Sequence, residues 1–394
     1  MSQTPVTPIL AYFAQLERIR RERAHQPEGS AAFAFRLEDG FAVLTRFDGD
    51  QPEADIPGEY SGLPVTQIAP YAFAGCEKLR RVMVPQGVTA IGEGAFGGCA
   101  ALESVSLPDS VTEMGAQCFA DCESLRSLSL PRGLKAIPAG LCRGCAALRS
   151  LTLPAGCAAI GRQAFSGCET LREITLPEAV AEVAEMAFFR CTALERIVLP
   201  KGMRRAARSA FAFCRSLGEI TLPEGMVELG EEAFFGCTGL RAAHLPASLT
   251  EVEGNPFGGC RELAEITVSA ENPVLLVEGG LLLHLKRRAV LCCPAARGQA
   301  FAILPEGTQE ICGHAFSDCR ALRRITLPEG MKCIGSAAFS GCTALRAVNL
   351  PESLESTGAE MFDGCSGLCI DAPQTPGENQ PADRCSPVLL GMEN

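Results

Sequence analysis

A cysteine recurs every 23 residues through most of this 394-residue chain. A fixed period of this length is typical of a solenoid, in which each repeat forms one coil that stacks on the next. The series runs Cys76, Cys99, Cys122, Cys145, Cys168, Cys191, Cys214, Cys237 and Cys260, and resumes with Cys319, Cys342 and Cys365. The spacing predicts one elongated domain instead of the several globular domains that this length otherwise allows.

Other positions of the repeat are also constant. Phenylalanine precedes the cysteine by three residues in every copy except one, where Cys142 replaces it, and leucine follows the cysteine by three. Two alternating apolar residues, such as Ile174 and Leu176, predict a short half-buried strand, which a proline closes. A glycine-rich corner and a short helical turn follow, as from Gly161 to Phe165. The chain should therefore form a right-handed coil of short parallel strands and short helical turns, with thiols and phenyl rings inside.

The repeat resembles a known family. Segments such as LREITLPEAVAEVAEMAFFRC and LGEITLPEGMVELGEEAFFGC are similar to the BspA-like leucine-rich repeats, and the likeness covers about residues 60–371. The resemblance implies a solenoid of 23-residue leucine-rich repeats from a bacterial family of non-enzymatic proteins. It also implies adhesion or host-matrix binding for the members that are displayed on a surface.

Breaks in the pattern predict the organisation of the chain. We expect an N-terminal helix or cap at 1–28, a capping hairpin and entry to the first coil at 29–70, a solenoid at 71–371 with a hairpin insertion at about 271–300, and a flexible C-terminal tail at 372–394. In the first segment, Ile9, Phe13, Leu16 and Arg20 predict an amphipathic helix. We expect this helix to shield the open end of the first coil; the alternative is a helix that binds a membrane surface or a partner.

The chain has 21 cysteines, which in a secreted protein would suggest disulfides. Because stacked side chains in successive coils point in parallel, the periodic cysteines should be reduced, buried thiols. No secretory signal is apparent, so the sequence favours a cytoplasmic protein. The resemblance implies the alternative of a secreted or cell-surface protein.

The composition argues against several classes of function. A net charge of −11, no tryptophan and three tyrosines disfavour a nucleic-acid surface, and no segment is apolar enough to span a membrane. The four histidines show no metal-ligand spacing, and Cys142 and Cys145, a lone CxxC pair, both occupy core positions of the repeat. We therefore predict no enzyme, no cofactor and no metal site. One alternative is a thiol redox or metal-binding protein that uses Cys292 and Cys293, because one of these neighbours in the insertion should face outward.

One surface shows order. The residue between the two apolar residues of each strand must point away from the core, and this column is mostly polar. Its candidate ligand-binding members are Ser106, Ser129, Thr152, Thr175, Thr221, His244, Thr267, Thr326 and Asn349. A structural interpretation is available, since threonine favours strands and stacked hydroxyls can pair across them.

The functional interpretation is a scaffold that binds a protein, or a glycan, along this sheet face. The alternative is an assembly protein whose solenoids pack together. The sequence leaves the ligand and the oligomeric state open.

Overall fold

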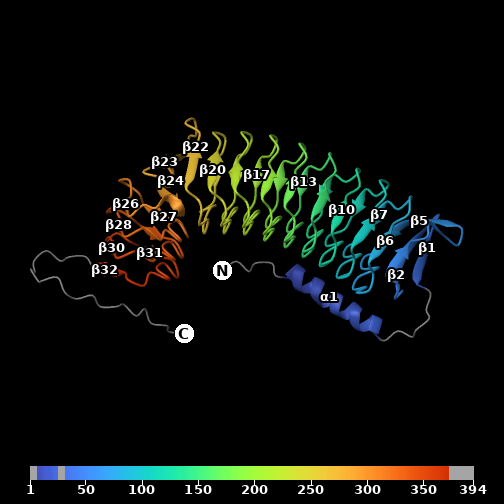
Figure 1. The fold of residues 1–394 in the computed structure, drawn as a ribbon. Coiled ribbons are helices and arrows are strands. Elements are labelled where there is room, and N and C mark those ends of the chain that lie inside the picture. The colour runs from blue at the N-terminus through green and yellow to red at the C-terminus, as the bar shows by residue number, and fades with distance from the viewer. Residues whose placement is uncertain (1–6, 25–31, 372–394) are drawn as a thin grey trace, which may run out of the picture. The chain divides into compact units, whose positions relative to one another are not determined.

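The computed structural model describes residues 7–24 and 32–371 (Figure 1). The chain divides into two compact units, Met1–Leu217 and Gly218–Asn394. Each coil of a solenoid contacts only its neighbours, so a repeat protein has no single central core. Both units are built from stacked coils with short parallel strands, so the predicted fold class is confirmed.

Unit 1 begins with α1 (Thr7–Ala24) and a hairpin of β1 (Phe33–Glu38) and β2 (Phe41–Phe47). Gly40 allows the tight turn of this hairpin because its φ is +88°, a left-handed value that glycine adopts without strain. The strand β2 then pairs in parallel with β5 (Leu63–Ile68), to which β4 (Glu59–Tyr60) is antiparallel. The second strand of the hairpin is thus joined directly to the first coil.

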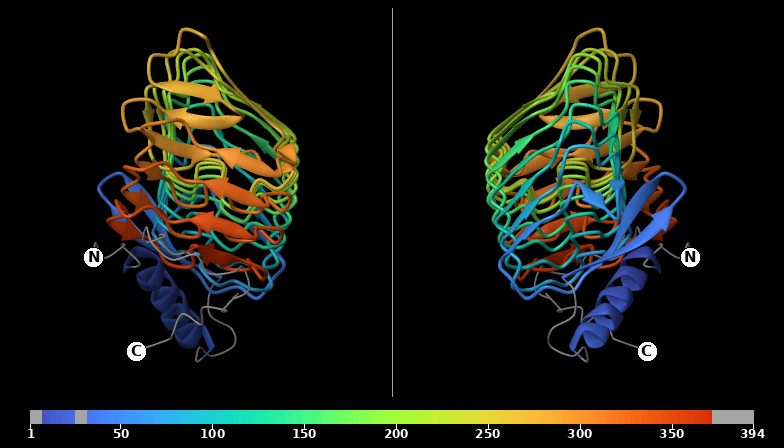
Figure 2. Two further views of the ribbon diagram at one scale, coloured as in Figure 1. Left: turned by 90° about the vertical axis from the view of Figure 1, so that its left-hand side faces the viewer. Right: turned by 90° about the vertical axis from the view of Figure 1, so that its right-hand side faces the viewer.

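Each coil of unit 1 contributes two short strands, which form two ladders. The first strand of successive coils is β3 (Glu53–Asp55), β6 (Arg81–Met83), β8 (Ser104–Ser106), β10 (Ser127–Ser129), β12 (Ser150–Thr152), β14 (Glu173–Thr175) and β16 (Arg196–Val198). After β5, the second strand is β7 (Ala90–Ile91), β9 (Glu113–Met114), β11 (Ala136–Ile137), β13 (Ala159–Ile160), β15 (Glu182–Val183) and β17 (Arg205–Ala206). Figure 2 shows the coils end on, with α1 outside them.

The predicted helical turns are present as successive hydrogen-bonded turns around the phenylalanine position. The amide of Cys99 donates to the carbonyl of Phe96 at 3.2 Å within one coil, and the amide of Phe96 donates to the carbonyl of Cys118 in the next coil at 2.9 Å. The turns therefore form a third hydrogen-bonded side of the stack, which we call the turn face. Each turn needs left-handed residues, such as Gln163 at φ +54° and Gly167 at φ +77°.

The interior contains the residues that the repeat predicts. Phe96 and Phe119 are fully buried and stack with their ring centroids 5.2 Å apart. Phe188 and Phe211 stack in the same way at 5.5 Å. Stacked rings of this kind exclude water and add a favourable aromatic contact to the burial of apolar area.

Unit 2 repeats the same plan. Its first strands are β18 (Glu219–Thr221), β20 (Ala242–Leu245), β22 (Glu265–Val268), β26 (Phe301–Ile303), β28 (Arg324–Thr326), β30 (Ala347–Asn349) and β32 (Cys369–Asp371). Its second strands are β19 (Glu228–Leu229), β21 (Glu251–Val252), β25 (Ala289–Cys292), β27 (Glu310–Ile311), β29 (Cys333–Ile334) and β31 (Ser356–Thr357).

An antiparallel insertion interrupts unit 2. The strand β23 (Leu275–Glu278) turns at Gly279 and Gly280 into β24 (Leu281–His284), which pairs with β25. The strand β25 then pairs in parallel with β27 and so returns the chain to the ladder of second strands. A short 3₁₀ helix, η1 (Ala295–Arg297), leads to β26.

Within residues 7–24 and 32–371, no helix is both long and apolar enough to cross a membrane. The predicted C-terminal tail at 372–394 lies outside the described residues.

The position of α1 differs from the prediction. The helix does not shield the open end of the first coil but lies on the turn face of unit 1, where Tyr12 and Leu16 pack against Ala74 and Ala120. The buried side chains are Tyr12 and Leu16, whereas Phe13 is 42% exposed. The reason is that Tyr12 and Leu16, four residues apart, share a helix face that fits the small side chains of the turns.

Candidate functional site

The outer sheet face consists of the outward side chains of the first strands. In the typical first strand the central residue is buried and the two flanking residues are exposed, as in β14 and β18. All nine candidate residues point outward from these strands, although Thr267 and Asn349 are only partly exposed. In unit 1 the parallel register places Ser129 beside Thr152. In unit 2 it places Thr221 beside His244, and His244 beside Thr267.

Three of the candidate residues have polar partners that limit what they can offer a ligand. The ring nitrogen Nδ1 of His244 lies 2.6 Å from the hydroxyl of Thr267. The side-chain amide of Asn349 donates to the carbonyl of Leu327 and accepts from the amide of the same residue, both at 3.1 Å. Asn349 therefore satisfies both backbone polar groups of Leu327 in the preceding coil.

The outward column two residues earlier carries ion pairs between coils. Arg196 lies 3.3 Å from Glu173, and Arg81 lies 3.3 Å from Glu53. These pairs are exposed, so each contributes little to stability. The hydroxyl column beside them consists mostly of uncharged side chains.

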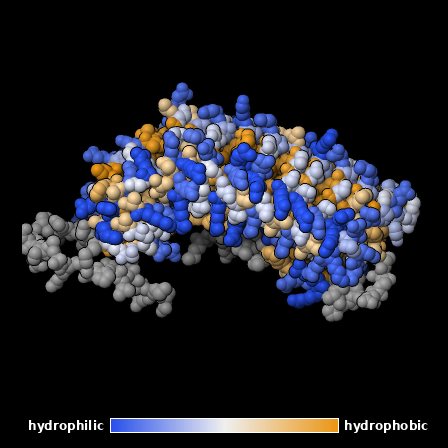
Figure 3. All heavy atoms as spheres, viewed as in Figure 1, coloured by the Kyte–Doolittle hydropathy of each residue, from blue (hydrophilic) through white to orange (hydrophobic). Residues whose placement is uncertain are grey.

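Two apolar residues of this face were missed in the sequence. Phe301 and Ile303 flank the buried centre of β26 and are 65% and 80% exposed. Ile303 pairs in register with Thr326, so it belongs to the same outward column. Figure 3 shows hydrophobic atoms at the surface of unit 2 around β23 and β26. The signal was available, because Pro305 aligns with the prolines that close the other first strands and marks the two residues before Leu304 as a strand.

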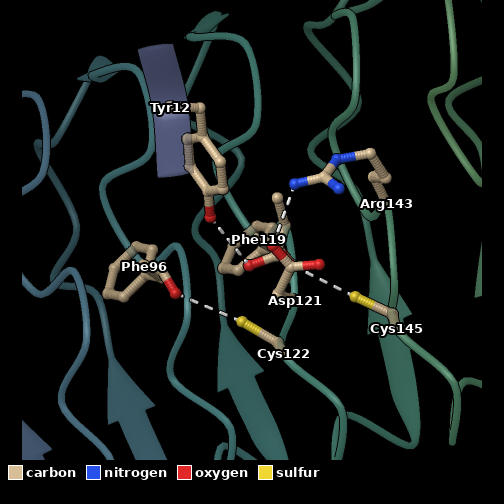
Figure 4. A network of polar contacts seen from close by, with 8 residues as sticks. Tyr12, Phe96, Phe119, Asp121, Cys122, Arg143 and Cys145 are labelled. Carbon is tan, nitrogen blue, oxygen red and sulfur yellow. Dashed lines mark hydrogen bonds and ion pairs between the residues drawn. The ribbon is translucent and has the colours of Figure 1, made fainter. Parts of the chain in front are cut away.

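The thiols form a ladder on the inner side of the turns. The thiol of Cys122 lies 3.2 Å from the carbonyl oxygen of Phe96, and that of Cys145 lies 3.1 Å from the carbonyl oxygen of Phe119 (Figure 4). The 19 described cysteines for which a state is assigned are all free thiols. The prediction of reduced, mostly buried thiols is therefore confirmed for these residues.

Burial makes these thiols poor nucleophiles. It raises the pKa of Cys191 to about 12 and that of Cys122 well above its usual value. A thiolate is the reactive form of cysteine, so a thiol that stays protonated is inert. Cys142 and Cys145 are both fully buried, and Cys142 takes the phenylalanine position, as predicted.

The prediction that Cys292 or Cys293 faces outward is wrong. Both are buried: every residue of β25, which ends at Cys292, is covered, and so is Cys293, which follows it directly. Cys293 takes the phenylalanine position of its coil: its amide donates to the carbonyl of Ala315 at 2.7 Å, and its carbonyl lies 3.7 Å from the thiol of Cys319. Burial also raises the pKa of Cys292. The exposed thiol that a redox or metal function required at this place is absent from β25 and Cys293.

Two histidines, the buried His284 and the partly buried His314, are packed against other residues of unit 2. Burial lowers the pKa of His284, whose Nδ1 accepts the amide of Arg287 at 3.3 Å. Burial likewise lowers the pKa of His314, which packs edge-on against Phe235. In the described part of the chain, no group of three or more histidine, cysteine, aspartate or glutamate side chains is placed to hold a metal ion.

A depression of about 590 Å³ lies at the start of the first-strand ladder in unit 1. Its charged residues pair with one another: Lys78 lies 2.7 Å from Asp50, and Arg80 lies 3.9 Å from Glu103. The charged residues that line the depression are therefore paired with opposite charges.

Comparisons with known proteins agree with this architecture. The family model of the BspA type leucine rich repeat region matches residues 61–172, 135–264 and 299–374, which together exceed half of the chain. A leucine-rich repeat protein from Bacteroides ovatus is 26% identical, with a TM-score of 0.59 over 88% of this chain and 94% of that one. A leucine rich cell surface protein from Faecalibacterium prausnitzii is 24% identical, with a TM-score of 0.54 over 88% of this chain and 89% of that one. No curated protein matches the chain.

The repeat, the stacked coils and the family match all agree, and the chain belongs to the BspA-type leucine-rich-repeat family.

Proposed function

We propose that the chain is a non-enzymatic scaffold that binds an extended segment of a protein along its outer sheet face, with β26 and β28 of unit 2 as the centre of the site. The observation that carries this proposal is the exposure of Phe301 and Ile303 on a strand of a face whose other outward side chains are mostly polar. Apolar side chains exposed side by side commonly mark interaction sites, and a few large anchors supply most of the binding free energy.

The neighbours of these two residues suit an extended peptide. Ile303 lies beside Thr326, and Phe301 lies beside Arg324. An apolar pair next to a hydroxyl and a guanidinium offers both anchoring contacts and hydrogen-bond donors. Every second side chain of an extended ligand would point towards these groups, and the side chains between them would point away.

The proposal can be tested with a peptide display library selected on the full chain. Peptides chosen in this way should bind Ile303→Arg and Thr326→Arg at least ten-fold more weakly, because each change places a bulky charge at the centre of the site. Leu285→Arg is the matched control, since Leu285 is 47% exposed in the insertion and lies off the first strands. Equal binding to all three variants would rule out β26 and β28 as the site.

A second set of variants measures how far the site extends. Thr175→Arg tests the sheet face of unit 1, and Thr221→Arg tests that of unit 2 at β18. Both residues are exposed, so the melting temperature should stay unchanged while peptide binding falls wherever the ligand reaches. A glycan array on the same variants separates a protein ligand from a glycan ligand.

The compartment of the scaffold is a separate question. A buried thiol that does not ionise oxidises slowly, so the thiol ladder is compatible with a cytoplasmic scaffold and with adhesion at a cell surface. Fractionation of cells that express the native protein distinguishes the two locations.

A further inference from the structure

The turn face of unit 1 carries a preformed site for a helix. We define this receptor site as Ala74, Gly75, Gly97, Gly98, Ala120, Asp121 and Arg143, which occupy the two positions before the cysteine in four successive coils. In the structure the helix α1 of the same chain occupies it (Figure 4).

Small residues let the helix approach the coils closely. A Cβ atom added at Gly97 would lie 2.5 Å from the hydroxyl oxygen of Tyr12, and one added at Gly98 would lie 3.3 Å from Leu16. Tyr12 and Leu16 are 2% and 3% exposed, and the Tyr12 hydroxyl donates to the carbonyl of Ala120 at 3.3 Å. The receptor site therefore accommodates an aromatic residue followed by a leucine four positions later.

Two charged residues complete the receptor site. Asp121 and Arg143 form an ion pair at 2.9 Å and belong to neighbouring coils, so the solenoid itself holds the guanidinium in place. The guanidinium carbon lies 5.3 Å from the ring centroid of Tyr12 and 4.9 Å from that of Phe13. A planar cation over two aromatic rings is a recognised binding arrangement. At the far end of the helix, Arg20 pairs with Glu77 at 3.5 Å.

We propose that this receptor site also binds α1 of a second copy of the chain, so that two molecules associate by helix exchange. Every contact described above between α1 and the coils is made by side chains of α1 and is independent of the covalent connection between the helix and the coils. The second copy supplies the same Tyr12, Phe13, Leu16 and Arg20, so it can reproduce all of these contacts. Exchange of an identical element is a known route to a dimer, and the helix of the same molecule competes through its high effective concentration.

Two complementary variants of the full chain remove this competition. Tyr12→Asp with Leu16→Asp destroys the donor helix and leaves the receptor site empty. Gly97→Leu blocks the receptor site and leaves the donor helix intact. Each variant alone should sediment as a monomer, and a mixture of equal amounts should contain a species of twice the mass.

The control replaces Gly97→Leu with Gly156→Leu, because the nearest atom to a Cβ at Gly156 is the Nζ of Lys135, at 3.4 Å and away from α1. Its helix stays on its own receptor site, so mixing should give at least ten-fold less dimer. If Gly97→Leu fails to fold by circular dichroism, Arg143→Glu serves as the second blocked receptor. A mixture that stays monomeric although both variants are folded would overturn the proposal, as would equal dimer formation with Gly156→Leu.

Discussion

The thiol of Cys191 lies 3.2 Å from the carbonyl oxygen of Phe165, which stands 26 residues earlier in the chain. The same carbonyl accepts the amide of Cys168 at 3.2 Å. One backbone oxygen therefore receives two donors from two different coils, and a thiol–carbonyl contact of the same kind recurs at most cysteine positions, as at Cys214 and Cys342. The cysteine is thus a connector between coils and not a latent disulfide.

Substitution of Cys191 tests this role. Cys191→Ala should lower the free energy of unfolding by about 1–2 kcal/mol, because a buried hydrogen bond and part of the packing are lost. Cys191→Ser should lower it further, by about 2–3 kcal/mol, since the shorter C–O bond leaves a buried hydroxyl out of reach of the carbonyl. Urea denaturation followed by circular dichroism measures both, and a serine variant as stable as the wild type would contradict the prediction.

The phenylalanine stack makes a second prediction. Phe165 is fully buried, and its ring centroid lies 5.3 Å from that of Phe188. Phe165→Ala should therefore cost about 3–5 kcal/mol of stability, because it leaves a cavity inside the coil. Phe301→Ala is the matched control: Phe301 is an exposed phenylalanine, so its loss should change stability by less than about 0.5 kcal/mol. Equal effects of the two changes in thermal unfolding would refute the inward assignment of the repeat phenylalanines.

A third prediction concerns the stability effect of replacing a glycine on the turn face. Gly167 has φ +77°, and a Cβ there would have ordinary contacts at 3.5 Å, so strain and not crowding opposes a side chain. Gly167→Ala should destabilise the protein by about 1 kcal/mol, the typical cost of a left-handed conformation for alanine. Gly156→Ala, at a glycine without a positive φ, should be neutral or slightly stabilising. Chemical denaturation of the pair distinguishes backbone strain from a general effect of glycine replacement.

Alkaline pH should destabilise the fold. Burial raises the pKa of Cys191 from 9.0 to about 12, so the unfolded chain releases this proton before the folded chain does. The contribution of the thiol is complete below pH 9 and is lost as the pH rises from 9 towards 12, by roughly 4 kcal/mol for a shift of this size. The melting temperature of the wild type should fall over this range, and that of Cys191→Ala should fall less. Parallel pH profiles for the two proteins would show that the pKa of Cys191 is the same in the folded and unfolded states, which would contradict the prediction.

The candidate site was predictable in part. Alternation within each repeat was enough to place Thr175, Thr221 and the rest of their column on the outside, because a strand directs successive side chains to opposite faces. Their role in binding stays a proposal. The same rule, counted from Pro305, would also have placed Phe301 and Ile303 on the outside, because Pro305 lies one period before Pro328.

Cys292 and Cys293 show where local alternation is not sufficient. In an isolated strand, one of two neighbours faces outward. In unit 2 the strand β25 has β24 on one side and β27 on the other, and all four of its residues are buried. Whether a strand has one covered face or two depends on which other segments pack over it.

By itself, the sequence determined the coil: its length, its strands, and the phenyl rings and thiols inside it. These features depend on contacts between residues one period apart, and a repeated sequence pattern indicates such contacts directly. Only the tertiary structure decided that α1 lies on the turn face beside Arg143, and that every residue of β25 is buried. Both depend on segments that occur once in the chain, so no repetition reveals their partners, and their places follow from which complementary surface is available after the coils have stacked.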